Sequence, residues 1–301
     1  MTRLRDQGRT EEAEEYLKQM SAERGAETLA GNISAQMAEE QPRRKPISVK
    51  YEVPLSFHLD PSLPWVEKHR PVSLMQLCGD VAPYLRAIVK KDSFPLALVF
   101  CGDYGEGKTA GAQAMIRDYY VLRQVFCPEA TFKDILLGSK WRSDYEGCWP
   151  PVLYVDAAKT PQVDEIKSKV LMFMKVRAMW NPNAGKLKKF CIFDEADRLS
   201  YAAQGLLRAL LEQYPGTVTV YTTNRIESID PAIISRASGG VFEFKKPNKK
   251  QLVEHMRCIL SLEKKQLPSK VLEEIAVNSA SVREAVGKLQ QEVIAKEADK
   301  P

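Results

Sequence analysis

A glycine-rich loop that ends in lysine and threonine carries the clearest chemistry in this sequence. Residues 102–109 read GDYGEGKT, the pattern of two glycines at fixed spacing followed by Lys-Thr. Glycines are required because the backbone must wrap around phosphate groups with its N–H groups pointing inward, in conformations that a Cβ obstructs. Lys108 supplies a positive charge and Thr109 a hydroxyl for Mg²⁺. The loop therefore predicts a site for a nucleoside triphosphate.

The residues on either side of the loop support this interpretation. Residues 96–100 (LALVF) form an apolar run typical of a buried strand, and residues 110–120 favour a helix. Strand, loop and helix in this order are the context that a phosphate-binding loop requires. The alternative, a glycine turn without a ligand, is disfavoured by these flanks.

A second apolar run ends in acidic residues and predicts the other half of the same site. Residues 189–197 read KFCIFDEAD. Asp194 would hold Mg²⁺ through water, and Glu195 would polarise the attacking water. These roles fit phosphoryl transfer, in which the protein contributes mainly positioning and charge stabilisation. Taken alone, Asp-Glu after a strand is also typical of a solvated helix start. Its combination with the glycine loop favours the catalytic interpretation.

Two further polar segments fit a nucleotide-dependent switch. Residues 221–224 (YTTN) end a predicted strand in hydroxyl and amide side chains, which are suited to orienting a water molecule beside a γ phosphate. A simple Thr/Asn turn is the alternative. Arg236 follows a helix-like segment at 231–234 and is placed to reach a phosphate across a subunit boundary. A surface salt bridge remains the competing explanation for Arg236.

Composition narrows the class of protein. The chain has 301 residues, 44% of them hydrophobic, which is enough to build a sizeable core. It contains no run of eighteen apolar residues and no apolar signal core at the N-terminus, so we expect no membrane partner and a cytoplasmic location, nucleoid-associated, or a nuclear one in a eukaryote. Its six cysteines form no Cys-x-x-Cys pair, which argues against zinc and favours reduced thiols, with a Cys127–Cys148 pair left open. Residues 64–301 carry a net charge of +7, compatible with a nucleic-acid backbone as partner.

The pattern along the chain predicts three parts. Residues 1–63 form a polar N-terminal extension, which is either a docking helix or a marginally helical arm. In residues 64–245, predicted strands alternate with helices, which favours a parallel sheet covered on both faces; the strands are 96–100, 152–155, 190–193 and 217–222. Residues 246–301 are expected to be a small helical lid, with helices at 248–265, 269–278 and 281–298.

An octapeptide ahead of the first predicted strand gives these motifs a family context. Residues 64–71 read PWVEKHRP, which resembles the opening signature of clamp-loader small subunits of the replication factor C type. Those proteins are AAA+ ATPases that open a ring-shaped sliding clamp and place it on primer-template DNA. The similarity runs from about residue 64 to 291, with the motifs in the same order. It implies an α/β fold, a P-loop AAA+ parallel sheet flanked by helices, followed by a helical lid.

The resemblance also implies a role for each motif. The catalytic residues would be Lys108, Asp194, Glu195, Asn224, Arg236 and Arg283. Arg236 would act in trans on the ATP of a neighbour, and Arg283 would sense the γ phosphate in cis. The nucleotide would contact Val66, Arg70, Gly102, Asp103, Tyr104, Gly105, Glu106, Gly107, Lys108, Thr109, Ala110, Asn224 and Arg283. Thr109 and Asp194 would hold Mg²⁺, while Lys159 and Lys167 fall where the family follows the DNA backbone.

This sequence also departs from the family pattern. Asp103 and Glu106 put two acids into the phosphate loop, and both would weaken nucleotide binding by repulsion unless they point outward. Ala237 replaces a cysteine, and His69 replaces a tyrosine. Residues 121–151 are an insertion, either a partner surface or a long loop.

The chain stops after the lid, where the family continues into a helical collar. Three explanations stay open: truncation, assembly through the ATPase faces, and replacement of the collar by the arm and insertion.

The function implied by the resemblance is that of a DNA-dependent ATPase subunit of a clamp loader, with ATP and Mg²⁺ as cofactors. Its expected partners are other clamp-loader subunits, a sliding clamp and primer-template DNA. Two alternatives remain from the residues: a non-hydrolysing nucleotide-binding scaffold subunit, or another AAA+ machine such as a helicase loader or junction motor.

Overall fold

A computed structural model describes residues 62–298, with gaps at 143–147, 149, 160–162, 177–179 and 182–184. The described residues all fall within one compact unit. Residues 1–61 of the predicted N-terminal arm lie outside them, as does part of the 121–151 insertion. Within the described ranges, none of the helices has the length and apolar character that crossing a bilayer requires.

A five-stranded sheet forms the centre of the fold, in the order β2-β5-β6-β1-β7 with all neighbours parallel. The strands β1, β5 and β6 are buried almost throughout, because helices cover both faces of a parallel sheet. In β1 and β5 this burial explains the continuous apolar runs. The strand bounds are β1 (Ala97–Gly102), β2 (Val152–Asp156), β5 (Lys189–Asp194), β6 (Thr217–Thr223) and β7 (Val241–Phe244), with a separate hairpin of β3 (Trp180–Asn181) and β4 (Gly185–Lys186).

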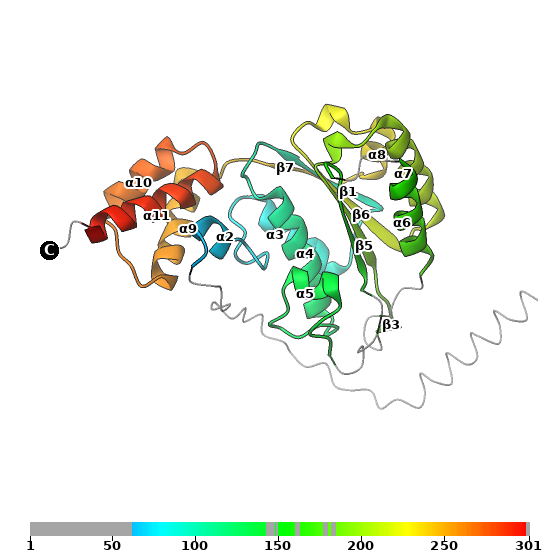
Figure 1. Cartoon of the computed structure of the whole chain (residues 1–301), viewed down its shortest axis with the longest axis horizontal. Coiled ribbons are helices and arrows are strands. Elements are labelled where there is room, and N and C mark those ends of the chain that lie inside the picture. The colour runs from blue at the N-terminus through cyan, green and yellow to red at the C-terminus, as the bar shows by residue number, and fades with distance from the viewer. Residues whose placement is uncertain are drawn as a thin grey trace, which may run out of the picture. The chain divides into compact units, whose positions relative to one another are not determined.

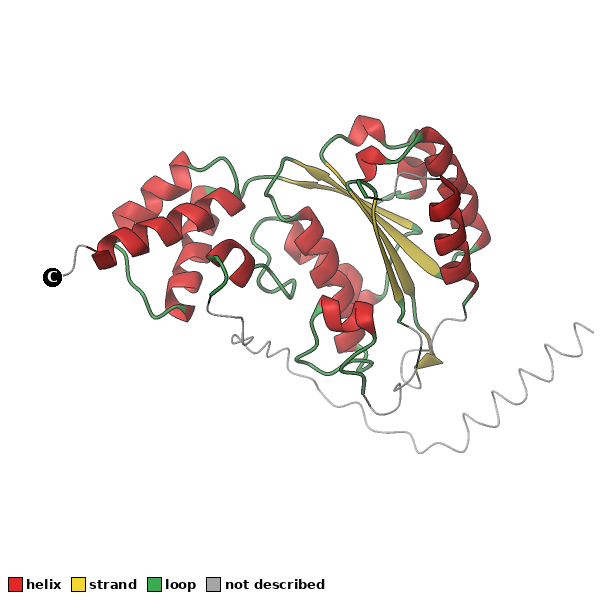
Figure 2. Ribbon diagram, viewed as in Figure 1, coloured by secondary structure: helices red, strands yellow, loops and turns green. Residues whose placement is uncertain are grey.

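Helices form a layer on each side of this sheet (Figures 1 and 2). One layer contains α3 (Val81–Lys91), α4 (Lys108–Leu122) and α5 (Phe132–Leu137). The other contains α6 (Val163–Lys175), α7 (Tyr201–Gln213) and α8 (Pro231–Arg236), with short 3₁₀ turns η2 (Ala196–Arg198) and η3 (Ile226–Ser228) between elements. Each layer encloses its own buried apolar cluster against the sheet.

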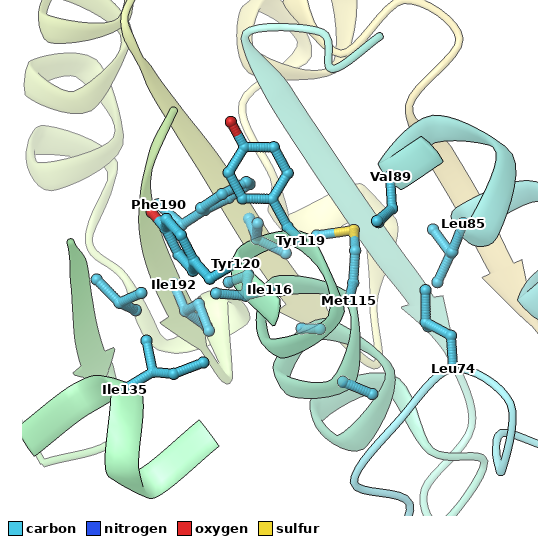
Figure 3. Close-up of a cluster of buried hydrophobic side chains, with 14 of the residues drawn as sticks. Leu74, Leu85, Val89, Met115, Ile116, Tyr119, Tyr120, Ile135, Phe190 and Ile192 are labelled. Carbon is cyan, nitrogen blue, oxygen red and sulfur yellow. The ribbon is translucent and has the colours of Figure 1, made fainter. Parts of the chain in front are cut away.

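The cluster beneath α4 fixes the helix that starts at the glycine loop. Figure 3 shows Met115, Ile116, Tyr119 and Tyr120 of α4 between α3 and the strand that carries Phe190. The tyrosine hydroxyls are satisfied at the edge of this core, since Tyr120 donates to the Lys188 carbonyl at 2.7 Å. Close packing on both sides leaves α4 little freedom to move relative to the sheet.

Parallel pairing brings the carboxyl ends of the central strands to one edge of the sheet. Cys101 lies opposite Thr223, and Phe193 lies opposite Tyr221. The loop after β1, the acids after β5 and the polar end of β6 therefore meet at this edge, which is where open α/β sheets bind ligands.

The last part of the chain is an all-helical bundle of α9 (Lys249–Leu262), α10 (Ser269–Asn278) and α11 (Val282–Ala298). The short helix α2 (Trp65–Lys68) joins its core through Trp65, which belongs to a buried apolar cluster that includes residues of all three helices. The Trp65 N–H also donates to Gln290 Oε1 at 2.9 Å. The octapeptide at 64–71 is thus anchored to the lid.

The predicted fold class and all four predicted strands are confirmed, with differences at the ends of elements. The lid helices begin and end within a few residues of the predicted bounds. The structure adds β7, which the sequence analysis did not include, and it assigns residues 121–122 to α4 rather than to the insertion. The insertion also contains α5, which starts with a capping box between Thr131 and Asp134. The domain boundaries after residues 63 and 245 stay predictions.

Candidate nucleotide site

The glycine loop encloses the ammonium group of its own lysine. Gly105 and Gly107 have φ of +81° and +88°, a region that favours glycine, and Gly107 is the N-cap of α4. Lys108 Nζ donates to the carbonyls of Gly102 and Asp103 at 2.8 and 2.7 Å. The loop therefore curves around a positive charge at the N-terminal end of a fifteen-residue helix, which is the arrangement that binds phosphate.

Asp194 is the point at which three side-chain hydroxyls converge. Thr109 Oγ1 donates to Asp194 Oδ1 at 2.8 Å, and Thr222 Oγ1 donates to the same oxygen at 2.5 Å. The Tyr154 hydroxyl donates to Asp194 Oδ2 at 2.5 Å. Burial, and then the hydrogen bond to Asp194, raises the pKa of Tyr154 well above its ordinary value, so the phenol stays protonated and acts as a donor.

The residue after Asp194 adopts an unusual backbone conformation. Glu195 has φ of +52°, which is uncommon for a residue with a side chain, and its N–H donates to Thr222 Oγ1 at 3.2 Å. The side chain is exposed and lines the same pocket as Asn224. A strained backbone conformation persists only where the surrounding structure maintains it. Such residues are typical of functional sites.

One pocket gathers most of the predicted nucleotide contacts. Its wall includes the predicted residues Val66, Arg70, Tyr104, Gly105, Glu106, Gly107, Lys108, Thr109, Ala110, Asp194, Glu195, Asn224 and Arg283. Gly102 and Asp103 are not on this wall; they contribute the carbonyls that bind Lys108. Residues that the sequence analysis did not identify complete the wall, among them Leu77, Cys78, His255 and Val286.

Two histidines on the lid side of this pocket are uncharged near neutral pH. Burial lowers the pKa of His69, although its Nε2 lies 2.7 Å from Glu263 Oε1, and burial lowers the pKa of His255 to about 4. Glu263 is held at the same time by Lys68. A wall of neutral rings and of the Val66 and Val286 side chains suits a flat, apolar heterocycle such as a nucleobase.

The lid closes on the phosphate loop through the start of α11. The Arg283 N–H donates to the Gly105 carbonyl at 3.3 Å, and the Arg283 side chain is exposed beside the loop. Among the described residues, the guanidinium has no ion-pair partner, so it is available to a ligand phosphate. The role of Arg283 as a cis-acting arginine stays a prediction.

The two acids of the loop behave differently. Asp103 is exposed, as the sequence analysis required, but Glu106 is not: its side chain is buried, with 4% of the residue accessible. Burial raises the pKa of Glu106, and the Val282 N–H of α11 opposes that rise. Glu106 therefore faces the lid, where burial disfavours its ionised form.

The remaining predicted residues lie outside this pocket. Arg236 donates to the Ala232 carbonyl at 2.8 Å and forms an ion pair with Glu212. Lys159 is exposed and lies 2.8 Å from Asp156, and Lys167 is exposed on α6. Their predicted roles, toward a neighbouring subunit or DNA, stay predictions.

The donors around Asp194 fit Mg²⁺. This ion prefers hard oxygen ligands and usually combines one or two protein oxygens with phosphate and water. The Thr109 hydroxyl and the Asp194 carboxylate provide such oxygens within hydrogen-bond distance of each other, next to the phosphate loop. Together they can hold Mg²⁺ at the end of a triphosphate.

Curated relatives of the sequence carry the name of the family that residues 64–71 resemble. The replication factor C small subunit of Methanococcus maripaludis strain S2 is 29% identical over 231 residues, which are 75% of this chain and 64% of that protein. The small subunit of Archaeoglobus fulgidus is 28% identical over 230 residues, and replication factor C subunit 3 of Blastobotrys adeninivorans is 26% identical over 234. The chain thus spans somewhat less than two thirds of these relatives' length. No protein-family model matches it.

Solved structures share the fold at lower identity. The Holliday junction branch migration motor RuvB of Thermotoga maritima has a TM-score of 0.55 and 16% identity, covering 78% of this chain and 68% of its own. Domain III of the replication initiation protein DnaA from the same organism has a TM-score of 0.51 and 18% identity, covering 80% and 92%. These similarities establish a P-loop AAA+ fold, and the curated relatives confirm the resemblance to replication factor C small subunits.

Proposed function

We propose that this chain, an AAA+ domain similar to replication factor C small subunits, binds and hydrolyses ATP as a subunit of a clamp-loader-type complex. The observation that carries the proposal is the contact between Thr109 of the phosphate loop and Asp194 of β5, at 2.8 Å, in the pocket that Arg283 also lines. It joins the two halves of the nucleotide site that were predicted separately from the sequence.

The geometry supports a separate catalytic or binding role for each of these residues. The loop N–H groups and Lys108 would bind the phosphates, and Thr109 with Asp194 would hold Mg²⁺. When bound, Mg²⁺ would neutralise charge on the phosphate oxygens. Glu195, whose backbone is fixed by Thr222, would orient and polarise a water molecule, with Asn224 beside it.

The proposal extends to partners through residues outside the pocket. Arg236 would reach the nucleotide of a neighbouring subunit after exchanging its ion pair with Glu212 for a phosphate. Lys159 and Lys167 are exposed and would follow the backbone of primer-template DNA, with a sliding clamp as the third partner. The cell compartment would be the cytoplasm, or the nucleus in a eukaryote.

ATP turnover by the purified chain tests this function, measured alone and with primer-template DNA plus a sliding clamp. Lys108→Ala is expected to abolish nucleotide binding. Glu195→Gln is expected to keep binding and lower turnover by about 100-fold or more, because it removes the general base. Arg236→Ala is expected to bind nucleotide normally and to lose the stimulated turnover.

The variants also separate the alternatives. Turnover in the wild type that equals that of Lys108→Ala, with DNA and clamp present, contradicts the enzymatic proposal. Tight nucleotide binding without turnover would instead identify a scaffold subunit that needs an active partner.

A further inference from the structure

Tyr154 reaches the candidate metal site from a strand with no predicted role there. On β2 it pairs with Ile192 of β5, and Asp194 lies two residues beyond Ile192. Side chains two residues apart on a strand share a face, so Tyr154 and Asp194 both face the α4 side of the sheet. The phenol spans the distance along the strands and donates to Asp194 Oδ2 at 2.5 Å.

The ring of Tyr154 is held by the 121–151 segment. Phe132, the first residue of α5, packs edge-on against it with ring centroids 6.3 Å apart. The capping box of Thr131 and Asp134 fixes the start of that helix and therefore the position of Phe132. The hydroxyl is thus presented to Asp194 from a supported position.

We propose that Tyr154 is a positioning residue for Mg²⁺ binding: its hydroxyl fixes the Asp194 carboxylate so that Oδ1 faces Thr109. With Thr109 and Thr222 on Oδ1 and Tyr154 on Oδ2, one orientation of the carboxylate satisfies every donor. Without the phenol, Oδ2 loses its donor and the carboxylate can rotate about its Cβ–Cγ bond.

The chemistry of the donor matters as well as its position. A phenol orients the carboxylate without bringing a positive charge, so it does not compete with the cation, as a lysine or arginine in its place would. The inference rests on the nucleotide site proposed above, and it gives the 121–151 segment a physical connection to that site through Phe132.

The test compares the full chain with Tyr154→Phe, which keeps the ring and removes the hydroxyl. Binding of a fluorescent, non-hydrolysable ATP analogue is titrated with Mg²⁺ and repeated in EDTA. The half-saturating Mg²⁺ concentration is expected to rise about 10-fold in the variant, as for other residues that orient a metal ligand, with unchanged affinity in EDTA. Tyr221→Phe is the matched control, because Tyr221 is buried against Phe193 on the opposite face of the sheet.

A second variant guards against a general loss of structure. Phe132→Leu leaves the hydroxyl in place but removes its supporting ring, and a smaller rise in the half-saturating Mg²⁺ concentration is expected. Equal Mg²⁺ dependence in wild type and Tyr154→Phe overturns the inference, even if the melting temperature falls. Absence of nucleotide binding in the wild type overturns the proposed function instead, so the two failures are distinguishable.

Discussion

Glu106 shows how a residue that is unfavourable for phosphate binding is accommodated in this loop. Its side chain is buried where the loop meets the lid, and Oε2 has no hydrogen-bond partner among the described residues. Burial of a carboxyl group disfavours the charged form, which is why the pKa of Glu106 is raised. The acid therefore costs folding stability when it ionises.

This predicts a pH-dependent effect of Glu106→Gln on stability. Below the ordinary pKa of glutamate, the carboxyl is protonated in both the folded and the unfolded chain and costs nothing. As the pH rises, the unfolded chain loses its proton first, so the wild type loses stability relative to the variant until the pH exceeds the raised folded pKa. Melting temperatures measured from about pH 4 to about pH 8 should show the variant's advantage growing with pH.

Glu254→Gln is the control, because Glu254 is exposed on α9. Its melting-temperature difference from the wild type should not grow with pH in the same way. If the melting-temperature difference between Glu106→Gln and the wild type is also independent of pH, ionisation of Glu106 does not destabilise the folded chain.

Residues that act through local spacing were predictable from the sequence, but contacts that form through strand pairing were not. Lys108 and Thr109 follow their glycines directly, and Asp194 follows an apolar run. Tyr154 and Thr222 lie 40 and 28 positions from Asp194, and they meet it only because β2 and β6 flank β5. A tyrosine in a short strand carries no local signal of that contact.

Among the elements, α6 has an uncommon C-terminal anchor. The ammonium of Lys189, at the start of β5, donates to the carbonyls of Phe173, Met174 and Val176 at 2.8, 2.8 and 2.6 Å. The last carbonyls of a helix have no partner within the helix, so this lysine satisfies groups that would otherwise be buried without a donor. Burial lowers the pKa of Lys189 to about 8.

Lys189→Met is therefore expected to destabilise the fold by about 2 kcal/mol, because it leaves buried carbonyl oxygens without donors. Urea unfolding measures the loss. Lys186→Met is the matched control, because Lys186 is exposed on β4, shortly before β5, and it should change stability by less than about 0.5 kcal/mol. Equal effects of both substitutions would contradict a role for the three carbonyl contacts.

The sequence analysis missed β7, the one strand of the central sheet that it did not include, and the reason is physical. Val241–Phe244 is short, lies at the sheet edge and is partly exposed, so its sequence lacks the apolar run that marked the other strands. Pairing with β1 holds β7 in its extended conformation. Gly102 of β1 lies so close to β7 that a Cβ on this residue would be 2.1 Å from the Phe244 carbonyl oxygen. Long-range pairing of this kind leaves no periodic signal in the strand itself.

At the scale of the whole described unit, the contacts between the phosphate loop and the lid should couple nucleotide binding to the position of the lid. Glu106 faces α11, and the Gly105 carbonyl accepts the Arg283 N–H. On the other side of the pocket, Lys68 and His69 bind Glu263 at the end of α9. Any change at these contacts should alter the lid and the nucleotide together, since the lid arginine and the loop share one pocket wall.

Gly105→Ala tests that coupling. A Cβ at this position would lie 2.7 Å from Ser281 Oγ and 3.2 Å from Arg283 Cβ, and the φ of +81° disfavours alanine. The lid must therefore move away from the loop, and nucleotide affinity, measured by fluorescence titration, is expected to fall about 10-fold, equivalent to about 1.4 kcal/mol. Gly205→Ala is the control: it lies within α7 with nothing inside 4 Å of the added Cβ, so it should stabilise the fold by about 0.5–1 kcal/mol and leave affinity unchanged.

The double variant Gly105→Ala/Ser281→Ala separates contact with the lid from strain in the loop. Removing Ser281 Oγ takes away the nearest obstacle to the new Cβ but leaves the backbone of residue 105 equally strained. If lid contact causes the loss, the double variant recovers part of the affinity relative to Gly105→Ala, and the non-additivity measures the coupling. If the two substitutions add independently, backbone strain in the loop alone explains the loss, and the lid would not respond to the conformation of the loop through this contact.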